Sequence, residues 1–485
     1  MRFFILGTLL GCLSLLLPAQ QLSHSQVLRD AHALERIIYK VHPAPYAYIS
    51  KDSIQERFRA MTAFEGDSLS AKEWEIRVRH LLISMGCGHT YVAGKKRKKL
   101  PPTNRFALPF QIFSDSTRAW ISGMADSVQK AGIPIGAELV ALDNQPIEKV
   151  LEKLHHHQST DGYNQTFGRQ LLNKKLLFNY LYIKYMAHDS LHIVTWKDKT
   201  GLINVDTIAG ARDKDLYSDN AERDTILKIL YHTGKGDQYF YYHPQQPEIG
   251  VLNIKAFHGK GSKLYRQAVK DLKKTHAKYL VIDMRDNTGG SFASSVNLIR
   301  HVANKSFQLR LHRRLFRSWH DQSLLNHLNR FSSFLMFDVF NPNLRWIKHG
   351  NVVYCLKYRP YCRRLHFDGQ VFLLTNGLSF SASSQTATYI RAVSNAVIIG
   401  DETGGGAFAN NGMQIPLFKL PASGLRIRVP QYHLDYRLGH DTGRGVMPDV
   451  HIQYQIDDIL RGRDLEWEAT LQWITQHPER QDLTK

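Results

Sequence analysis

Short apolar runs and helical segments alternate along residues 248–405, and this alternation constrains the fold more than any other feature of the chain. The runs IGVLNIKAF, KYLVIDMRD, GQVFLLTNG and AVIIGDETGG have the length and composition of buried strands. Between them lie SKLYRQAVKDLKKTHA, SSVNLIRHVA and SASSQTATYIRAV, which we interpret as helices. Because parallel strands need long crossover connections, this order predicts an α/β layer with parallel strands.

The segment before this layer has the pattern of a helical domain, which we place at residues 21–102. Apolar residues recur at helical spacing in SQVLRDAHALERIIYKVH: Leu28, Ala31, Leu34 and Ile37. A second helix, SAKEWEIRVRHLLISMG, starts at Ser70 with Glu73 three residues later, as in a capping box. It is expected to end at Gly86, directly before CGHTYV.

Residues 131–156 combine a Gly-rich turn, a strand, an Asp-Asn turn and a helix. This order resembles the second half of a PDZ domain, with Glu138 where that family usually has Asp. PDZ domains bind an extended C-terminal peptide by strand addition. We therefore expect a PDZ-like β domain at residues 103–190, followed by a connecting β segment at residues 191–247.

The α/β alternation is interrupted at residues 307–364, which fit no βα unit. Two interpretations stay open: an insertion packed on the core, or a lid or membrane-surface contact that uses the apolar stretch 331–340. The α/β core is expected to span residues 248–455 including this insertion. A C-terminal helix or tail follows at residues 456–485.

The first twenty residues have the form of a secretory signal, with Arg2, an apolar run, and expected cleavage after Ala19 or Gln20. LLGC, which ends at Cys12, also resembles a lipoprotein cleavage box, so lipidation is an alternative. We expect export to the periplasm or cell envelope. An oxidising compartment permits a disulfide, and Cys355 and Cys362 are the obvious local pair.

The net charge of +20 raises the question of nucleic-acid binding. The basic residues are scattered, with concentrations only in GKKRKKL and LHRRLFR, and we recognise no nucleic-acid-binding motif. We therefore expect a cationic solvated surface and no nucleic-acid partner. A peripheral contact with acidic components of the cell envelope stays an alternative.

Three short motifs carry residues suited to catalysis. In TNGLSFSASSQTATYI, serines lie between a strand and a helix, where α/β sheets place ligands, although a serine there also fits a helix cap. In VIDMRDNTGG, Gly289 and Gly290 let a backbone N–H approach a ligand, or simply close a tight turn. His89 lies between a helix end and a β-type segment, where a lone histidine is usually structural.

The segments LVIDMRDNTGGS, SFSASS, IGDETGGG and GRGVMPDV occur in this order and resemble the catalytic core of the C-terminal processing (tail-specific) peptidases and of the tricorn core protease. The resemblance implies a multidomain α/β (α+β) protein with a ClpP/crotonase-like catalytic core. It implies Ser381 as nucleophile. It also implies the backbone N–H groups of Ala382 and of Gly289 or Gly290 as oxyanion donors. Ser384 stands where the family has Glu.

The resemblance also indicates the general base. Tail-specific members use a Lys in the Gly-rich turn, but that turn here reads DETGGGAF, and the next Lys is Lys419. Tricorn-type members use a His from an upstream helical segment, which implies His89. They supply an orienting acid from the segment before G-V-x-P-D, which implies Asp441, with Glu402 as a second candidate. Gly88 stands where those members have Ser.

These motifs and the resemblance predict an exported serine endopeptidase that cleaves unfolded or C-terminally exposed peptide segments through an acyl-enzyme. The partner is a polypeptide substrate whose carboxyl end the PDZ-like domain would hold or whose access it would gate. No metal or cofactor is required. Two alternatives stay open: a homologue that has lost catalysis and binds peptides or lipophiles, and an envelope interaction protein that uses the basic surface and residues 331–340.

Overall fold

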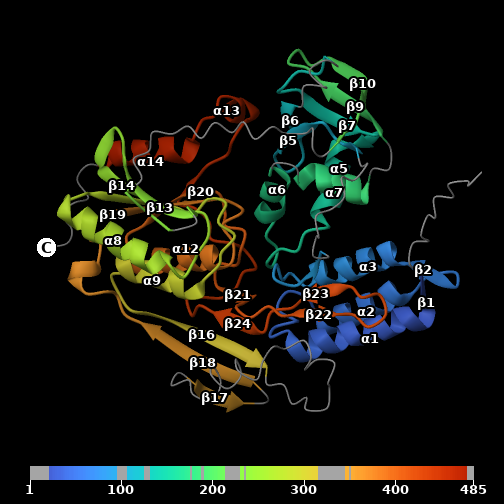
Figure 1. Cartoon of the computed structure of the whole chain (residues 1–485), viewed down its shortest axis with the longest axis horizontal. Coiled ribbons are helices and arrows are strands. Elements are labelled where there is room, and N and C mark those ends of the chain that lie inside the picture. The colour runs from blue at the N-terminus through green and yellow to red at the C-terminus, as the bar shows by residue number, and fades with distance from the viewer. Residues whose placement is uncertain are drawn as a thin grey trace, which may run out of the picture.

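The computed structural model describes residues 21–94, 106–124, 132–174, 177–186, 190–212, 230–233, 236–314, 344–348 and 351–477. Figure 1 shows three parts: N-terminal helices in blue, a β domain in teal and green, and a larger α/β core in yellow-green to red. The predicted fold class, a mixed α/β multidomain protein, is confirmed.

The N-terminal helices are α1 (His24–Val41), α2 (Lys51–Thr62) and α3 (Ala71–Ser84). Serine side chains cap all three at Ser23, Ser50 and Ser70, where each hydroxyl accepts a backbone N–H of the first turn. The predicted core face of α1 needs one correction, because Leu28 is 44% exposed and Val27 is buried in its place. Strands β1 (Gln21–Ser23) and β2 (Ser68–Ser70) pair beside these helices.

A seven-stranded sheet forms the centre of the core, in the order β12-β13-β14-β15-β19-β20-β25. Its parallel strands are β14 (Gln246–Ile254), β15 (Tyr279–Asp283), β19 (Gln370–Thr375), β20 (Val397–Gly400) and β25 (Val450–His451). Strands β12 (Tyr231–His232) and β13 (Gln238–His243) extend it in the antiparallel sense. The predicted parallel sheet is therefore confirmed, and residues 230–243 belong to it rather than to a connecting segment.

Helices cover both faces of this sheet (Figure 1). On one face lie α8 (Gly261–Lys274), α9 (Phe292–Val302) and α12 (Ala382–Val393), and on the other lies α14 (Leu465–Gln476). Along β15, Leu280 and Ile282 pack on the first helix layer while Tyr279 and Val281 pack toward α14. Burial on both faces explains why these strands read as continuous apolar runs.

Residues 307–364 were predicted to be an insertion, and their described ends interrupt the α/β alternation and pack on the core, as the first of the two interpretations expected. Strands β16 (Phe307–Arg314), β17 (Leu344–Lys348) and β18 (Asn351–Tyr358) form a second sheet with β21 (Ala409–Gly412) and β24 (Tyr432–Asp435). This sheet shares the helix-side core, because the Tyr389 hydroxyl on α12 donates to the Gln308 carbonyl at 2.9 Å. The short helix η3 (Arg363–Leu365) follows. The stretch 331–340 lies outside the described residues.

The β domain is a six-stranded sheet. It contains β5 (Phe110–Ser114), β6 (Ala119–Met124), β7 (Glu138–Leu142), β8 (Gln145–Pro146), β9 (Leu191–Lys197) and β10 (Ile203–Ala209). Helices α5 (Ile147–His155), α6 (Thr166–Leu172) and α7 (Leu177–Tyr185) pack against this sheet in one hydrophobic core. The predicted Asp-Asn turn joins β7 to β8 with φ of 47° at Asp143 and 62° at Asn144, as a two-residue hairpin requires. Strands β9 and β10 pair within this sheet, so residues 191–209 belong here and not to a connecting segment.

Several smaller features complete the described structure. Strands β4 (Phe106–Ala107) and β11 (Ala211–Arg212) pair with each other, and α13 (Ile456–Leu460) precedes α14. The predicted disulfide is not formed, because Cys355 and Cys362 are both free thiols. No helix in the described ranges is long and apolar enough to cross a membrane.

One hairpin of the core reaches into the N-terminal helices (Figure 1). Strands β22 (Leu417–Lys419) and β23 (Arg426–Arg428) form it, and β23 pairs with β3 (Tyr91–Ala93) directly after His89. Phe418, Leu420, Ile427 and Val429 are fully buried in one cluster with α1, α2 and α3. At about 1.5–3 kcal/mol for each buried side chain, this packing holds the helical domain to the core.

A buried carboxylate reinforces the same junction. Asp30 on α1 accepts the Ala422 N–H at 2.7 Å, the Ser423 N–H at 3.0 Å and the Trp74 indole N–H at 3.1 Å. We expect Asp30→Ala to lower the free energy of unfolding by about 1–3 kcal/mol for each donor left unpaired. Urea denaturation measures this change. The matched control is Asp67→Ala at an exposed position, expected to stay within about 0.5 kcal/mol of wild type. Equal midpoints for the two variants would contradict the assignment.

Candidate active site

Ser381 lies at the junction between β19 and α12, at the carboxyl end of a central strand. Its φ of 58° and ψ of −115° are unusual for a residue with a Cβ, and such a backbone costs about 1–3 kcal/mol. Its side chain makes no capping hydrogen bond with α12. The interpretation of Ser381 as a simple helix cap is therefore wrong, and its hydroxyl is left for another partner.

The neighbouring serines brace this turn. The Ser379 hydroxyl donates to the Met284 carbonyl at 2.8 Å and accepts the Asn376 N–H at 3.1 Å. The Ser384 hydroxyl donates to the Ser379 carbonyl at 2.8 Å and accepts the Gly405 N–H at 3.1 Å. Ser384, which replaces the expected Glu, therefore connects the serine turn to the Gly-rich turn.

His89 reaches Ser381 from the N-terminal domain. Helix α3 ends at Ser84, and a turn closed by the Thr90 N–H on the Cys87 carbonyl at 3.0 Å presents the imidazole. His89 Nε2 lies 3.0 Å from Ser381 Oγ, although the two residues are 292 positions apart. At this distance the serine hydroxyl can donate to a neutral imidazole.

The His89 imidazole is 8% exposed, and burial lowers its pKa to about 4. The ring is therefore neutral at neutral pH, as a general base must be. Its Nδ1 has no hydrogen-bond partner within the described residues. The ring packs on Phe380 at a centroid distance of 4.9 Å, and Phe380 packs on Phe167 at 4.8 Å. Aromatic contacts, rather than an acid, hold the imidazole.

Neither predicted orienting acid contacts His89 among the described residues. Asp441 accepts the Tyr48 hydroxyl and, at 2.9 Å, the Gly443 N–H. Glu402 accepts the Arg444 guanidinium at 2.9 Å and the Gly445 N–H at 2.7 Å. Burial acts to raise the pKa of Glu402, but these donors outweigh it and hold the pKa below its usual value. Both acids therefore bind other groups instead of His89.

The glycine loop that was predicted to supply an oxyanion donor lies against Ser381 through Gly289. A Cβ placed on Gly289 would lie 2.8 Å from Ser381 Cβ and 3.1 Å from the Ala382 nitrogen, so only glycine allows this approach. The Gly289 N–H itself donates to Asn287 Oδ1 at 2.9 Å and is occupied. The N–H groups of Gly290 and Ala382 have no acceptor within the described residues, and they can face a developing negative charge.

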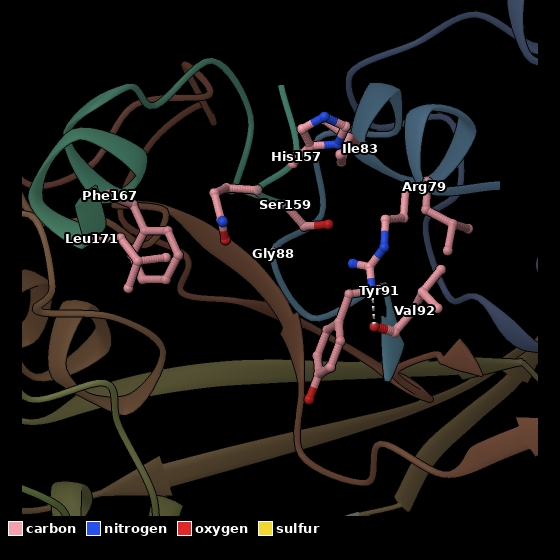
Figure 2. Close-up of a pocket in the computed structure, with 11 residues that line it drawn as sticks. Arg79, Ile83, Gly88, Tyr91, Val92, His157, Ser159, Phe167 and Leu171 are labelled. Carbon is pink, nitrogen blue, oxygen red and sulfur yellow. Dashed lines mark hydrogen bonds between the residues drawn. The ribbon is translucent and has the colours of Figure 1, made fainter. Parts of the chain in front are cut away.

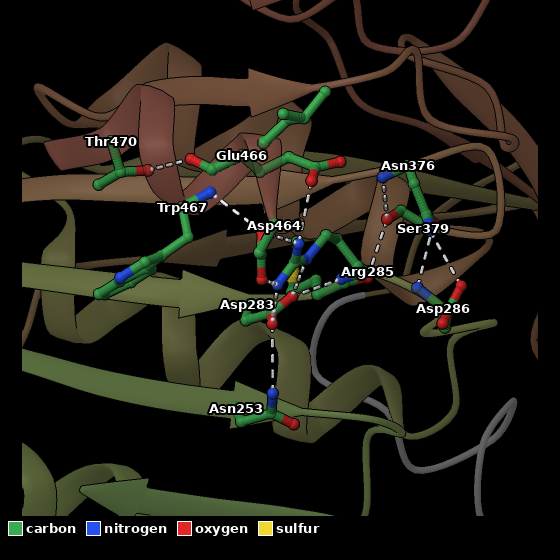
Figure 3. A network of polar contacts seen from close by, with 12 residues as sticks. Asn253, Asp283, Arg285, Asp286, Asn376, Ser379, Asp464, Glu466, Trp467 and Thr470 are labelled. Atoms are coloured by element: carbon green, nitrogen blue, oxygen red, sulfur yellow. Dashed lines mark hydrogen bonds and ion pairs between the residues drawn. The ribbon is translucent and has the colours of Figure 1, made fainter. Parts of the chain in front are cut away.

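A polar network fixes the loop that carries these glycines (Figure 3). Arg285 pairs with Asp283 at 2.9 Å, Asp464 at 2.7 Å and Glu466 at 3.0 Å, which ties the end of β15 to α14. Asn376 donates to Asp286 at 2.9 Å and accepts its N–H at 3.0 Å. The charged residues of DMRDN therefore support the loop structurally.

Two residues around the candidate site were missed in the sequence. Asp161, in the loop after α5, is 3% exposed and accepts the Gly88 N–H at 2.8 Å, and Tyr48 binds Asp441. Burial raises the pKa of Asp161 to about 7. Its partners Gly88 and Gly406 lie 73 and 245 positions away, so no local pattern could have indicated it.

A cavity of about 210 Å³ opens beside Gly88. Figure 2 shows Phe167 and Leu171 of α6 on one side and Arg79, Tyr91 and Val92 on the other. Further lining residues are Leu82, Ile83, His157, Gln158 and Ser159. Polar and apolar atoms contribute about equally to the wall, and Arg79 is occupied by the Val92 carbonyl at 3.3 Å and by Glu75 at 2.9 Å. The cavity therefore suits an uncharged side chain. Among the described residues, no group of His, Cys, Asp or Glu is placed to hold a metal ion.

Comparison with known proteins adds to this geometry. Residues 248–452 match peptidase family S41, and residues 104–218 match a PDZ domain. A carboxyl-terminal-processing protease of Picosynechococcus sp. is 23% identical over 235 residues, which cover 47% of this chain and 46% of that protein. The match therefore spans about half the length of this curated relative.

Solved structures share the fold. Mature CPAF superimposes with a TM-score of 0.62 at 14% identity, over 95% of this chain and 99% of that one. The complex of mature CPAF with lactacystin gives the same TM-score and identity over 94% and 98%. The chain therefore carries a serine peptidase domain of the S41 type at residues 248–452, joined to a PDZ domain at residues 104–218, and is a homologue of carboxyl-terminal-processing proteases.

Proposed function

We propose that this protein is a serine endopeptidase that cleaves unfolded or C-terminally exposed segments of polypeptides. The observation that carries the proposal is the 3.0 Å contact between His89 Nε2 and Ser381 Oγ, next to the Ala382 N–H, which like that of Gly290 has no acceptor among the described residues. A nucleophile, a neutral base and anion donors in one place meet the chemical needs of acyl transfer.

The reaction follows from the positions of these groups. His89 Nε2 takes the hydroxyl proton as Ser381 Oγ attacks the scissile carbonyl carbon, and the Gly290 and Ala382 N–H groups receive the oxyanion. Collapse of the tetrahedral species breaks the C–N bond, and the imidazolium returns its proton to the leaving amine. Water then attacks the acyl-enzyme with His89 as base, which releases the new carboxylate and restores the Ser381 hydroxyl.

The substrate class rests on two further features. The first is the relative, which is a carboxyl-terminal-processing protease. The second is the PDZ domain at residues 104–218, which would hold the substrate's carboxyl end by strand addition. The cavity beside Gly88 is the place proposed for an uncharged substrate side chain, since it adjoins the loop of His89.

Export remains part of the proposal. It rests on the secretory form of residues 1–20, with Cys12 as the alternative lipidation site, and predicts a periplasmic or envelope location. The alternative of a homologue without catalysis is less favoured, because the departures at Gly88 and Ser384 leave the Ser381–His89 contact in place. The interaction-protein alternative depends on the basic surface and on residues 331–340, and the latter lie outside the described ranges.

Covalent labelling tests the nucleophile. We expect a fluorophosphonate to modify wild type rapidly, to leave Ser381→Ala unmodified, and to react about 10²–10⁴-fold more slowly with His89→Ala, which lacks the base. Intact-protein mass spectrometry measures the rate. Ser383→Ala is the matched control, because the Ser383 hydroxyl is buried, has no partner in the described structure, and lies two positions from the nucleophile. Labelling of Ser381→Ala at the wild-type rate would refute the assignment.

The pH dependence tests the base. His89 acts only when neutral, and because burial lowers its pKa from 6.5 to about 4, it stays neutral well into the acid range. We expect the fluorophosphonate labelling rate to fall with a midpoint near pH 4, where half of His89 is protonated, rather than with a midpoint near 6.5. If the labelling rate instead falls with a single midpoint at the ordinary histidine pKa, the imidazole is not desolvated.

Filling the cavity tests its role. Leu171→Trp narrows the space beside Gly88, and we expect kcat/KM for an unfolded polypeptide to fall about tenfold or more while fluorophosphonate labelling is retained. The control Leu191→Trp lies on the β domain at a 58% exposed position outside the cavity lining, and should cleave as wild type does. Undiminished cleavage by Leu171→Trp would exclude the cavity as a substrate subsite.

A further inference from the structure

Three consecutive residues after α5 contact three separate loops of the candidate site. The Gly162 N–H donates to the Gly86 carbonyl at 2.8 Å, and the Tyr163 N–H donates to the Gly443 carbonyl at 2.8 Å. Asp161 accepts the N–H groups of Gly88 at 2.8 Å and Gly406 at 3.4 Å. We call residues 159–163 the clamp loop.

The clamp loop holds the backbone on both sides of His89. Gly88, directly before it, donates its N–H to Asp161 Oδ1, and Thr90, directly after it, accepts the Ser159 hydroxyl at 3.0 Å. Since His89 Nδ1 has no partner in the described structure, the position of the imidazole depends on this backbone and on the Phe380 ring.

Asp161 also reaches the turn behind the nucleophile. Its Oδ2 accepts the Gly406 N–H, and a Cβ on the adjacent Gly405 would lie 2.9 Å from the Ser381 nitrogen. One carboxyl group therefore joins the loop of the base to the turn that supports the nucleophile. Such a bridge controls the separation of two groups that must stay within hydrogen-bond distance for proton transfer.

The free-energy cost of burying the Asp161 carboxyl group argues against a purely structural role. The side chain is 3% exposed, and no Lys or Arg pairs with it among the described residues. Burial first, and then the nearby Asp441, raise its pKa to about 7, although the two N–H donors act in the opposite direction. A buried carboxyl without a cation is costly, and groups of this kind gather at functional sites.

The surrounding packing leaves the clamp loop little freedom. A Cβ on Gly88 would meet the Phe380 ring at 2.5 Å. Gly162 has φ of 59°, and a Cβ there would lie 2.4 Å from the Gly443 carbonyl oxygen. Small movements of this loop therefore pass directly to the residues that flank His89.

We propose that Asp161 is a positioning residue that sets the His89–Ser381 geometry by holding Gly88 and Gly406. This inference rests on the proposed peptidase function. Asp161 does not contact the reacting atoms, and it acts through the backbone that carries His89.

Rate measurements on purified full-length protein test the proposal. We expect Asp161→Ala to lower kcat for an unfolded polypeptide about 10–100-fold with KM nearly unchanged, because a misplaced base slows chemistry rather than binding. Fluorophosphonate labelling should slow by a similar factor. Asp161→Asn, whose carbonyl oxygen can still accept the Gly88 N–H, should recover part of the lost rate. This rescue by the conservative variant distinguishes positioning from a general loss of stability.

Asp30 supplies the matched control. It is also buried and accepts two backbone N–H groups across a domain junction, but its partners Ala422, Ser423 and Trp74 lie outside the site. Asp30→Ala should lower stability while the rate per mole of folded protein stays at the wild-type value. Thermal unfolding of each variant gives the folded fraction.

The outcomes separate the two proposals. If wild type is labelled at Ser381 and Asp161→Ala is labelled equally fast, the positioning role is overturned and the peptidase function stands. If wild type is not labelled at all, the peptidase function fails, and this inference fails with it. Should Asp161→Ala not fold, Asp161→Asn decides: a lowered kcat with unchanged KM supports the role, and a wild-type kcat overturns it.

Discussion

The pairing of β3 with β23 is the contact on which the candidate site depends. It brings the turn after α3 to the core, so His89 meets Ser381 across 292 positions of sequence. The pairing spans only three residues, and its stability comes from the apolar side chains of the β22–β23 hairpin buried among α1, α2 and α3. Burial at the domain junction, rather than hydrogen bonding in the strand pair, therefore holds the two halves of the site together.

Burial also sets the chemistry within the site. It lowers the pKa of His89 to about 4 and keeps the imidazole neutral, while the Phe380 ring fills the space on one side. The strained backbone of Ser381 frees its hydroxyl from the helix cap and leaves the Ala382 N–H unpaired among the described residues. Rigid packing of α12 between two sheets can carry this strain, because the helix buries residues on all sides.

The departures from the family pattern have local physical reasons. A side chain at position 88 would collide with Phe380, so the serine expected before the histidine has no room. Ser384 exchanges hydrogen bonds with Ser379 and Gly405 where a longer acidic side chain would have to be accommodated in a fully buried place. The two predicted acids are bound elsewhere, Glu402 by Arg444 and Asp441 by Tyr48. Because neither acid contacts His89, the clamp loop and the aromatic contacts hold the imidazole.

The sequence by itself determined the parallel α/β layer, because strands buried on both faces must be continuous apolar runs separated by crossover helices. It also determined the PDZ domain, whose Asp143-Asn144 turn permits one hairpin geometry, and it indicated Ser381 and His89 through ordered motifs. Only the tertiary structure decided that residues 307–314 and 351–358 are strands of a second sheet, that β9 belongs to the PDZ domain, and that Asp161 lies beside Gly88. The physical reason is range: hydrophobic periodicity and turn chemistry act over a few residues, whereas the partners of a buried carboxylate or of an edge strand are set by packing between segments far apart in the chain.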